Sequence, residues 1–142
     1  MSKIIVLMVF ICMGFVSCST PKTAVKEVSI EGTWKLNYIT GPKIAFDGLF
    51  PENKPTIIFD LKQNRFTGNN SCNQYFGALL TDGGKINFKD AKIAMTMMAC
   101  EGDGDSVYME ALNKIESYTI TDDGKTLNFL LGNVVMLRFI HQ

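Results

Sequence analysis

Histidine is nearly absent from this sequence: His141, next to the C-terminus, is the only one in 142 residues. With a single histidine, most Ser-His-Asp and Cys-His catalytic arrangements and any multi-histidine zinc site are ruled out. An excess of charge of either sign is also missing, since 14 basic side chains face 14 acidic ones. A nucleic-acid-binding protein normally carries a basic stripe, so this balance argues against a nucleic-acid partner.

One long apolar run is present, at residues 4–16, and it follows Lys3 and precedes Ser17 and Cys18. A basic residue, an apolar run and a small residue in this order are typical of a secretory signal. The run has about 13 residues, which is short for a helix that must cross ~30 Å of hydrocarbon. The sequence Phe-Val-Ser-Cys that ends at Cys18 resembles the lipobox of bacterial lipoproteins, with Phe15 in place of the usual leucine.

This resemblance implies that residues 1–17 are removed as a signal peptide and that Cys18 is acylated. Several acyl chains hold a protein stably on a membrane, because each buried CH₂ contributes ~0.8 kcal/mol. Residues 18–31 then form a polar tether, and residues 32–142 form the folded domain. We expect anchoring in the bacterial cell envelope, with the outer membrane favoured because the residues after Cys18 lack an inner-membrane retention aspartate. The alternatives are an ordinary cleaved signal and an uncleaved apolar anchor.

Short β-rich segments separated by turns fill most of the domain. Alternating or β-branched side chains predict strands at 33–40, 56–61, 65–68, 75–80, 85–88, 92–98, 117–121, 126–131 and 134–140. The sequence Thr-Asp-Gly-Gly at 81–84 and the Gly-Asn pair at 132–133 predict hairpins. Residues 41–55 predict a long loop with a short extended piece at 44–46.

Only one segment has helical periodicity. Tyr108, Leu112 and Ile115 recur with the spacing of one helix face within residues 105–117, and Asp105 or Ser106 can cap the first turn. No βαβ alternation is visible. We therefore predict an α+β fold of seven or eight mostly antiparallel strands, as a partly open barrel or curled sheet, with one α-helix over an opening.

Cys72 and Cys100 are the two cysteines that remain for the domain if Cys18 is acylated. Thiols in an oxidising compartment tend to be joined, so we expect a disulfide between them. Closing a loop of about 29 residues stabilises a domain by roughly 3–4 kcal/mol. The alternatives are two separate buried thiols, a nucleophilic cysteine, which has no neighbouring base, and a zinc site, which lacks a ligand set.

Two other clusters suggest chemistry. The sequence Met-Thr-Met-Met at 95–98 offers soft ligands for Cu(I), but alternating methionines on a strand favour core packing. Asp103, Asp105 and Glu110 form the only local acidic cluster, which a carboxylate-dependent hydrolase would have to bring together in a cleft. We expect no metal and no other cofactor.

The apolar loop residues Phe46, Leu49 and Phe50 suggest a contact patch. The same residues can instead fold back on the core. A partly open barrel could also shelter an acyl chain, which would require an apolar cavity of ~300 Å³ or more.

Several short motifs, taken in order, resemble those of the META domain, the family of HslJ-like heat-shock lipoproteins. They lie at Gly32, Trp34, Leu36, Gly68, Cys72, Asn73, Gly77, Thr96, Met98, Ala99 and Cys100. Ser71 stands where the family usually has glycine, so the bend before Cys72 must accept a Cβ. We expect structural roles: the glycines suit close backbone approach, Asn73 suits a bend, and Trp34 is a core anchor whose N–H needs a partner.

The resemblance implies a β-rich domain with one helix, no established enzyme activity, and association with stress or antibiotic tolerance or, in some parasites, with virulence and motility. We therefore expect a monomeric, non-enzymatic lipoprotein that binds a protein or an envelope polymer. A carboxylate-dependent hydrolase, a lipid-sheltering barrel, and a chaperone-like or inhibitory protein are the alternatives.

Overall fold

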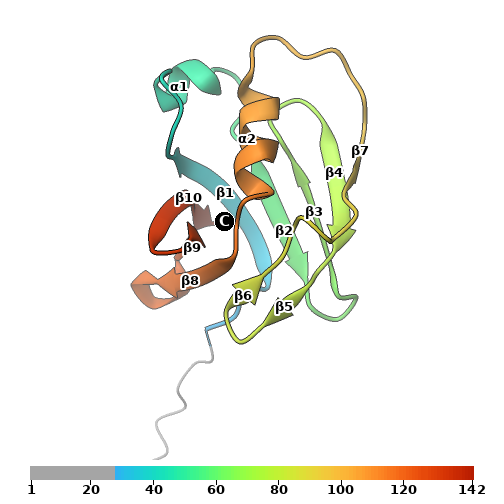
Figure 1. The fold of residues 1–142 in the computed structure, drawn as a ribbon, viewed down its shortest axis with the longest axis vertical. Helices are drawn as coiled ribbons and strands as arrows, with labels where there is room; N and C mark the ends of the chain where they lie inside the picture. The colour runs from blue at the N-terminus through green and yellow to red at the C-terminus, as the bar shows by residue number, and fades with distance from the viewer. Residues whose placement is uncertain (1–27) are drawn as a thin grey trace, which may run out of the picture.

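Ten antiparallel strands form one sheet in the computed structural model, which describes residues 28–142 (Figure 1). They lie side by side in the order β5-β6-β8-β9-β10-β1-β2-β3-β4-β7. The strands are β1 (Gly32–Ile39), β2 (Thr56–Asp60), β3 (Arg65–Asn69), β4 (Gln74–Ala78), β5 (Thr81–Asp82), β6 (Lys85–Ile86), β7 (Ala94–Met95), β8 (Ser117–Thr121), β9 (Thr126–Leu131) and β10 (Val134–His141). The predicted signal peptide, Cys18 and most of the predicted tether lie outside the described residues.

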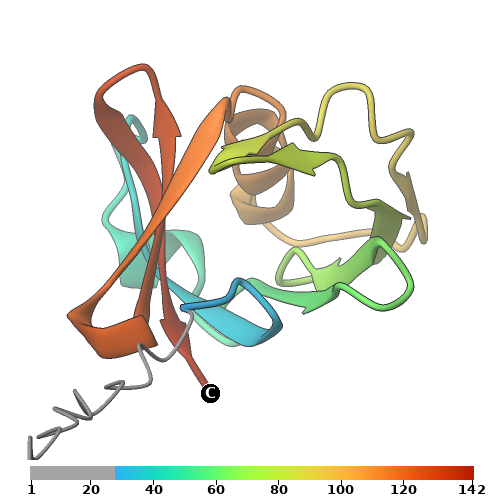
Figure 2. The ribbon, with the colours of Figure 1, turned by 90° about the horizontal axis from the view of Figure 1, so that it is seen from below.

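The sheet curls around the helix α2 (Gly104–Leu112), which lies across the opening (Figure 2). The predicted curled antiparallel sheet with one main helix is therefore confirmed. The sheet has ten strands where seven or eight were predicted, and β5, β6 and β7 have only two residues each. Within residues 28–142, no helix is long and apolar enough to cross a membrane.

Three local predictions are wrong. The segment expected to be extended at 44–46 leads instead into a one-turn helix, α1 (Phe46–Leu49). The helix α2 begins at Gly104 with Asp103 in the capping position, and neither Asp105 nor Ser106 caps it. Instead, the Ser106 hydroxyl donates to the main-chain oxygen of Asp103 at 2.9 Å. The helix also ends at Leu112, so Ile115 lies beyond it, although the predicted segment reached residue 117. A 3-10 turn, η1 (Asp122–Gly124), joins β8 to β9.

Glycines lie beside large side chains on the inner face of the sheet. Residues paired across antiparallel strands lie on the same face, so a series of pairs forms a row. The first row runs through His141, Trp34, Ile57, Gly68, Tyr75 and Met95. The second row runs through Gly32, Phe59, Phe66 and Gly77. In both rows the motif glycines lie next to aromatic rings, which explains why glycine is needed there.

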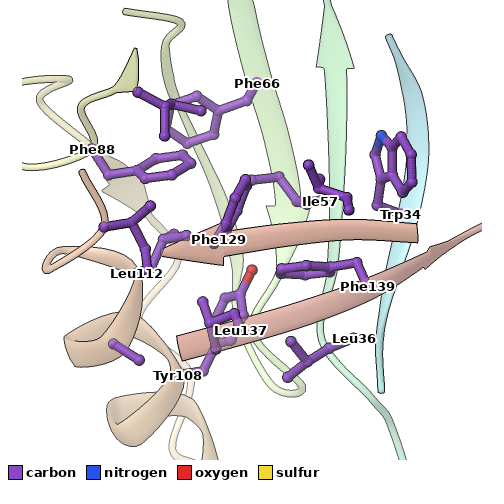
Figure 3. Close-up of a cluster of buried hydrophobic side chains, with 14 of the residues drawn as sticks. Trp34, Leu36, Ile57, Phe66, Phe88, Tyr108, Leu112, Phe129, Leu137 and Phe139 are labelled. Carbon is purple, nitrogen blue, oxygen red and sulfur yellow. The ribbon is translucent and has the colours of Figure 1, made fainter. Parts of the chain in front are cut away.

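Aromatic side chains fill the space between the sheet and α2 (Figure 3). Phe129 contacts Phe139 and Phe88, with ring centroids 5.2 and 5.4 Å apart respectively. Trp34 is fully buried, and its indole N–H donates to the main-chain oxygen of Ile30 at 2.8 Å. Aromatic rings thus occupy the centre of the curl, while a hollow of about 810 Å³ lies open at its rim, between β6 and the residues that follow α2. Charged as well as apolar side chains line that hollow, and the lipid-sheltering barrel stays a prediction.

Candidate functional site

The motif residues fall into two groups in the fold. Gly32, Trp34 and Leu36 lie on β1, in the middle of the sheet. Gly68 and Gly77 lie within β3 and β4, and five others gather where the bend between β3 and β4 meets the segment that follows β7. We call the second group the motif cluster, and its members are Cys72, Asn73, Thr96, Met98 and Cys100.

A disulfide joins Cys72 to Cys100, as predicted, with 5.9 Å between the two Cα atoms. It ties the bend after β3 to the segment that leads from β7 to α2. A sulfur in a disulfide has no thiolate to attack a substrate or to bind zinc. The structure therefore contains the disulfide. It does not contain the alternatives considered for these two cysteines, which were separate thiols, a nucleophile and a zinc site.

Asn73 is the centre of the motif cluster and is only 4% exposed. Its side-chain oxygen accepts from the Thr96 hydroxyl and from the Met98 N–H, both at 2.8 Å. Its side-chain N–H group donates to the Met98 carbonyl at 3.4 Å and to the Cys100 sulfur at 3.1 Å. One amide side chain thus binds both main-chain groups of Met98, as a neighbouring strand residue would.

The bend before Asn73 is held by two further asparagines. The Asn70 side-chain oxygen accepts from the main-chain N–H groups of Cys72 and Asn73 at 3.1 and 2.7 Å. The Asn69 side-chain oxygen accepts from the Ser71 N–H at 2.8 Å. Ser71 itself has a φ of 88°, in the region that favours glycine. The Cβ that this chain carries in place of the usual glycine is therefore accommodated at the expense of backbone strain.

Two buried tyrosines, one on β4 and one on α2, contact each other through their hydroxyl groups. The Tyr75 hydroxyl donates to the Thr56 carbonyl at 2.9 Å and lies 2.7 Å from the Tyr108 hydroxyl. A Cβ at Gly68 would stand 2.4 Å from the Tyr75 ring, so glycine makes room for this pair. Burial raises the pKa of both phenols well above the ordinary value. Both stay neutral near pH 7 and hold the strands to α2, which is a structural role.

The acidic cluster does not form a catalytic pair. Glu110 is exposed, and its carboxylate accepts from the Lys114 ammonium at 2.6 Å. That hydrogen bond is the main cause that lowers the pKa of Glu110. Asp105 lies five residues earlier on α2, about 140° around a helix of ~3.6 residues per turn. Among residues 28–142, no group of three or more acidic, cysteine or histidine side chains could hold a metal ion.

The loop that was expected to expose a contact patch folds onto the core instead. Phe50 is 1% exposed and Leu49 is 7% exposed, while Phe46 is half-buried against Phe50 with 5.3 Å between ring centroids. A Cβ at Gly104 would stand 2.4 Å from the Leu49 carbonyl, because the loop lies directly against the start of α2. The contact-patch prediction is therefore wrong: α1 turns its apolar side inward.

Apolar side chains are exposed in a different place. Met97 is 87% exposed, Met98 57%, Met95 45% and Phe76, on β4, 58%. The prediction that these methionines fill the core is wrong, because β7 lies at the edge of the sheet with no strand beyond it. We call Phe76, Met95, Met97 and Met98 the β4–β7 surface, which extends around the edge of the sheet, since Met95 lies on the face of Tyr75 and Phe76 on the outer face. Sequence reasoning missed Phe76, although its alternation with the buried Tyr75 indicates an outward side chain.

Two hollows adjoin this part of the molecule. One of about 370 Å³ lies over β3 and β4, next to Thr67, Gln74 and Phe76. Another of about 330 Å³ lies beside the disulfide, between Phe50 and Glu101. Both hollows are open to solvent, so they suit contact with the surface of a partner better than enclosure of a small substrate.

Comparisons with known proteins agree with this fold. The model of the META domain family matches residues 26–141. An NMR structure of a protein from Burkholderia xenovorans has a TM-score of 0.61 and 22% identity, over 79% of this chain and 82% of the other. The crystal structure of a DUF4847 family protein from Bacteroides vulgatus has a TM-score of 0.53 and 19% identity, over 83% and 97%. A search of curated proteins finds no significant match.

Proposed function

The chain belongs to the META domain family, and on that premise we propose that it is a non-enzymatic lipoprotein of the bacterial cell envelope. In this proposal the acylated Cys18 anchors it, with the outer membrane favoured, and the folded domain binds a protein or an envelope polymer during stress. The anchor is supported by the apolar run at 4–16 and the Phe-Val-Ser-Cys sequence. The disulfide agrees with an exported protein, because such bonds persist in oxidising compartments.

The observation that carries the binding role is the β4–β7 surface. Four large apolar side chains are exposed next to the motif cluster, where a disulfide and Asn73 hold the backbone in place. A concentration of large exposed apolar side chains at one edge of a domain favours a site of interaction. The polar groups that are well positioned in this region bind the backbone, so they support a rigid binding surface better than an active site.

The anchor is tested by the mass and the location of the protein expressed with its own first 17 residues. We expect the mass of a chain that starts at an acylated Cys18, recovered with the membranes. The Cys18→Ser variant should lose the acyl mass and leave the membrane fraction. A wild-type chain that is recovered unacylated, or that retains residues 1–17, would contradict the proposal.

The binding role is tested by crosslinking in intact cell envelopes, with a photoreactive residue at position 76. The matched control carries it at Val134, which is 56% exposed at the start of β10, several strands away from β4. We expect a crosslinked protein or glycan at position 76 that does not form at position 134. Equal or absent crosslinking at both positions would count against this surface.

A further inference from the structure

The segment that follows β7 is held straight along β4 well beyond the two residues of the strand. The Thr96 N–H donates to the Gln74 carbonyl at 3.0 Å, and Met98 binds the Asn73 amide through both main-chain groups. Alternate residues of an extended chain turn their main-chain groups to opposite sides. Those of Ala94, Thr96 and Met98 face β4, so those of Met95 and Met97 face outward. No other group within residues 28–142 binds them.

Apart from the shortness of β7, this open edge carries none of the usual protection. Natural sheets blunt their edges with charged side chains, prolines, bulges or a covering loop, because unpaired main-chain groups recruit other strands. From Ile93 to Ala99 the chain has no charged residue and no proline. Met95 and Met97 instead expose apolar side chains on either side of Thr96. A straight, apolar edge of this kind is suited to pairing with another strand.

We propose that the occupant of this edge is a second copy of the same chain, paired antiparallel about a two-fold axis at Thr96. In this register Met95 of each copy lies opposite Met97 of the other, and these are the residues whose main-chain groups face outward. A two-fold contact places the same surface on both partners, so it requires a self-complementary edge. A strand with an acid at one end and a base at the other meets that requirement.

The charges at the two ends provide this complementarity. Lys92 precedes the uncharged stretch and Glu101 follows it, and both side chains are exposed. Antiparallel pairing about Thr96 brings the Lys92 end of each copy to the Glu101 end of the other, with the chain turning at Lys92, where φ is 51°. Neither side chain has an ion-pair partner among residues 28–142. A parallel pair would set like charges side by side.

The contact is small, since one pair of short strands buries less than the ~1,200 Å² that is usual for a stable complex. We therefore expect a reversible dimer, in place of the monomer that the sequence suggested. Sharing one membrane would raise the local concentration of the chain and favour the dimer. Only this last point rests on the proposed anchor, and the pairing itself does not.

Sedimentation velocity of residues 18–142 with Cys18→Ser tests the proposal, because residues 28–142 contain the ten-stranded sheet and its buried core. We expect a concentration-dependent monomer–dimer equilibrium. Lys92→Glu and Glu101→Lys should each weaken the dimer about tenfold through like-charge repulsion. The double variant should recover the wild-type affinity, which a local structural role for either residue would not produce.

Met97→Lys should abolish the dimer, while the matched control Val134→Lys should leave it unchanged. Both side chains are mostly exposed, so both variants should keep the wild-type circular dichroism spectrum and melting temperature. A wild-type chain that stays monomeric up to ~1 mM, a dimer that tolerates Met97→Lys, or a double variant as weak as the single ones would overturn the proposal. Acylation is measured separately by mass, so failure of the anchor would be recognised independently.

Discussion

The two edges of the sheet handle the same physical problem in opposite ways. At one edge, β5 has two exposed residues, and its hairpin partner β6 begins directly after Gly83 and Gly84 with the exposed Lys85. The charge of Asp82 and the short strand leave little for another chain to pair with. At the other edge, β7 continues into an uncharged stretch that Asn73 and a disulfide hold straight. The comparison shows two kinds of sheet edge. The β5 edge is protected by a short strand and a charged side chain, whereas the β7 edge continues as an extended, unpaired segment.

Removing the disulfide should have the largest effect, because it should loosen the β7 edge more than the β5 edge. The double variant Cys72→Ala and Cys100→Ala should lose roughly 3–4 kcal/mol of unfolding free energy, because the loop between them is no longer closed. Urea unfolding measures this loss, and hydrogen exchange should show faster exchange near β7 than near β5. Equal acceleration at both edges would mean that the disulfide acts on the whole domain.

Asn73→Ala should have the next largest effect, a loss of about 2–3 kcal/mol, because it leaves the Met98 N–H and the Thr96 hydroxyl without their partner. Gln74→Ala is the matched control, since Gln74 is exposed and holds Thr96 through its main chain. Urea unfolding of both variants should separate them by at least ~1 kcal/mol. A Gln74→Ala variant that is equally destabilised would contradict the special role of Asn73.

High pH should loosen the strands next to β7. The pKa values of Tyr75 and Tyr108 are raised in the folded state, so the unfolded chain loses these protons first as the pH rises. The stability is therefore complete below pH ~10 and falls above it, by about 1.4 kcal/mol per pH unit for each tyrosine. In urea unfolding at a series of pH values, Tyr108→Phe should remove about half of this slope. An unchanged slope would show that other groups cause it.

Ser71→Gly should have the smallest effect and sharpen the comparison by stabilising the β7 side alone. Glycine accepts the positive φ of Ser71 without a Cβ, so we expect a gain of about 1 kcal/mol. Asn64→Gly, in the turn between β2 and β3 with a φ of 48°, is the control and should gain less, because asparagine tolerates this region. Thermal unfolding of both variants measures the difference, and a destabilised Ser71→Gly variant would exclude strain at this bend.

The architecture could be predicted from the sequence because its signals are local. Alternation along β1, the turn glycines between β5 and β6 and the Gly-Asn pair between β9 and β10 each specify their own element. The spacing of Tyr108 and Leu112 located α2 for the same reason. The disulfide followed from the number of cysteines left after export.

The position of the exposed surface could not be predicted in this way. Whether a methionine is buried depends on which strand lies beside it, and strand order is a long-range property. Met95 and Met97 have the alternation of a packed strand, yet no strand covers them. Phe50 was misjudged in the opposite direction, because nothing nearby in sequence indicates that its loop lies against α2.

The close fit of glycines against aromatic rings on the inner face limits which substitutions this sequence can accept during evolution. Phe66 and Gly77 occupy one space between them, and a Cβ at Gly77 would stand 2.7 Å from the Phe66 ring. A larger residue at one position is therefore tolerated only with a smaller residue at the other. The two positions should covary, and a single substitution at either one should be destabilising.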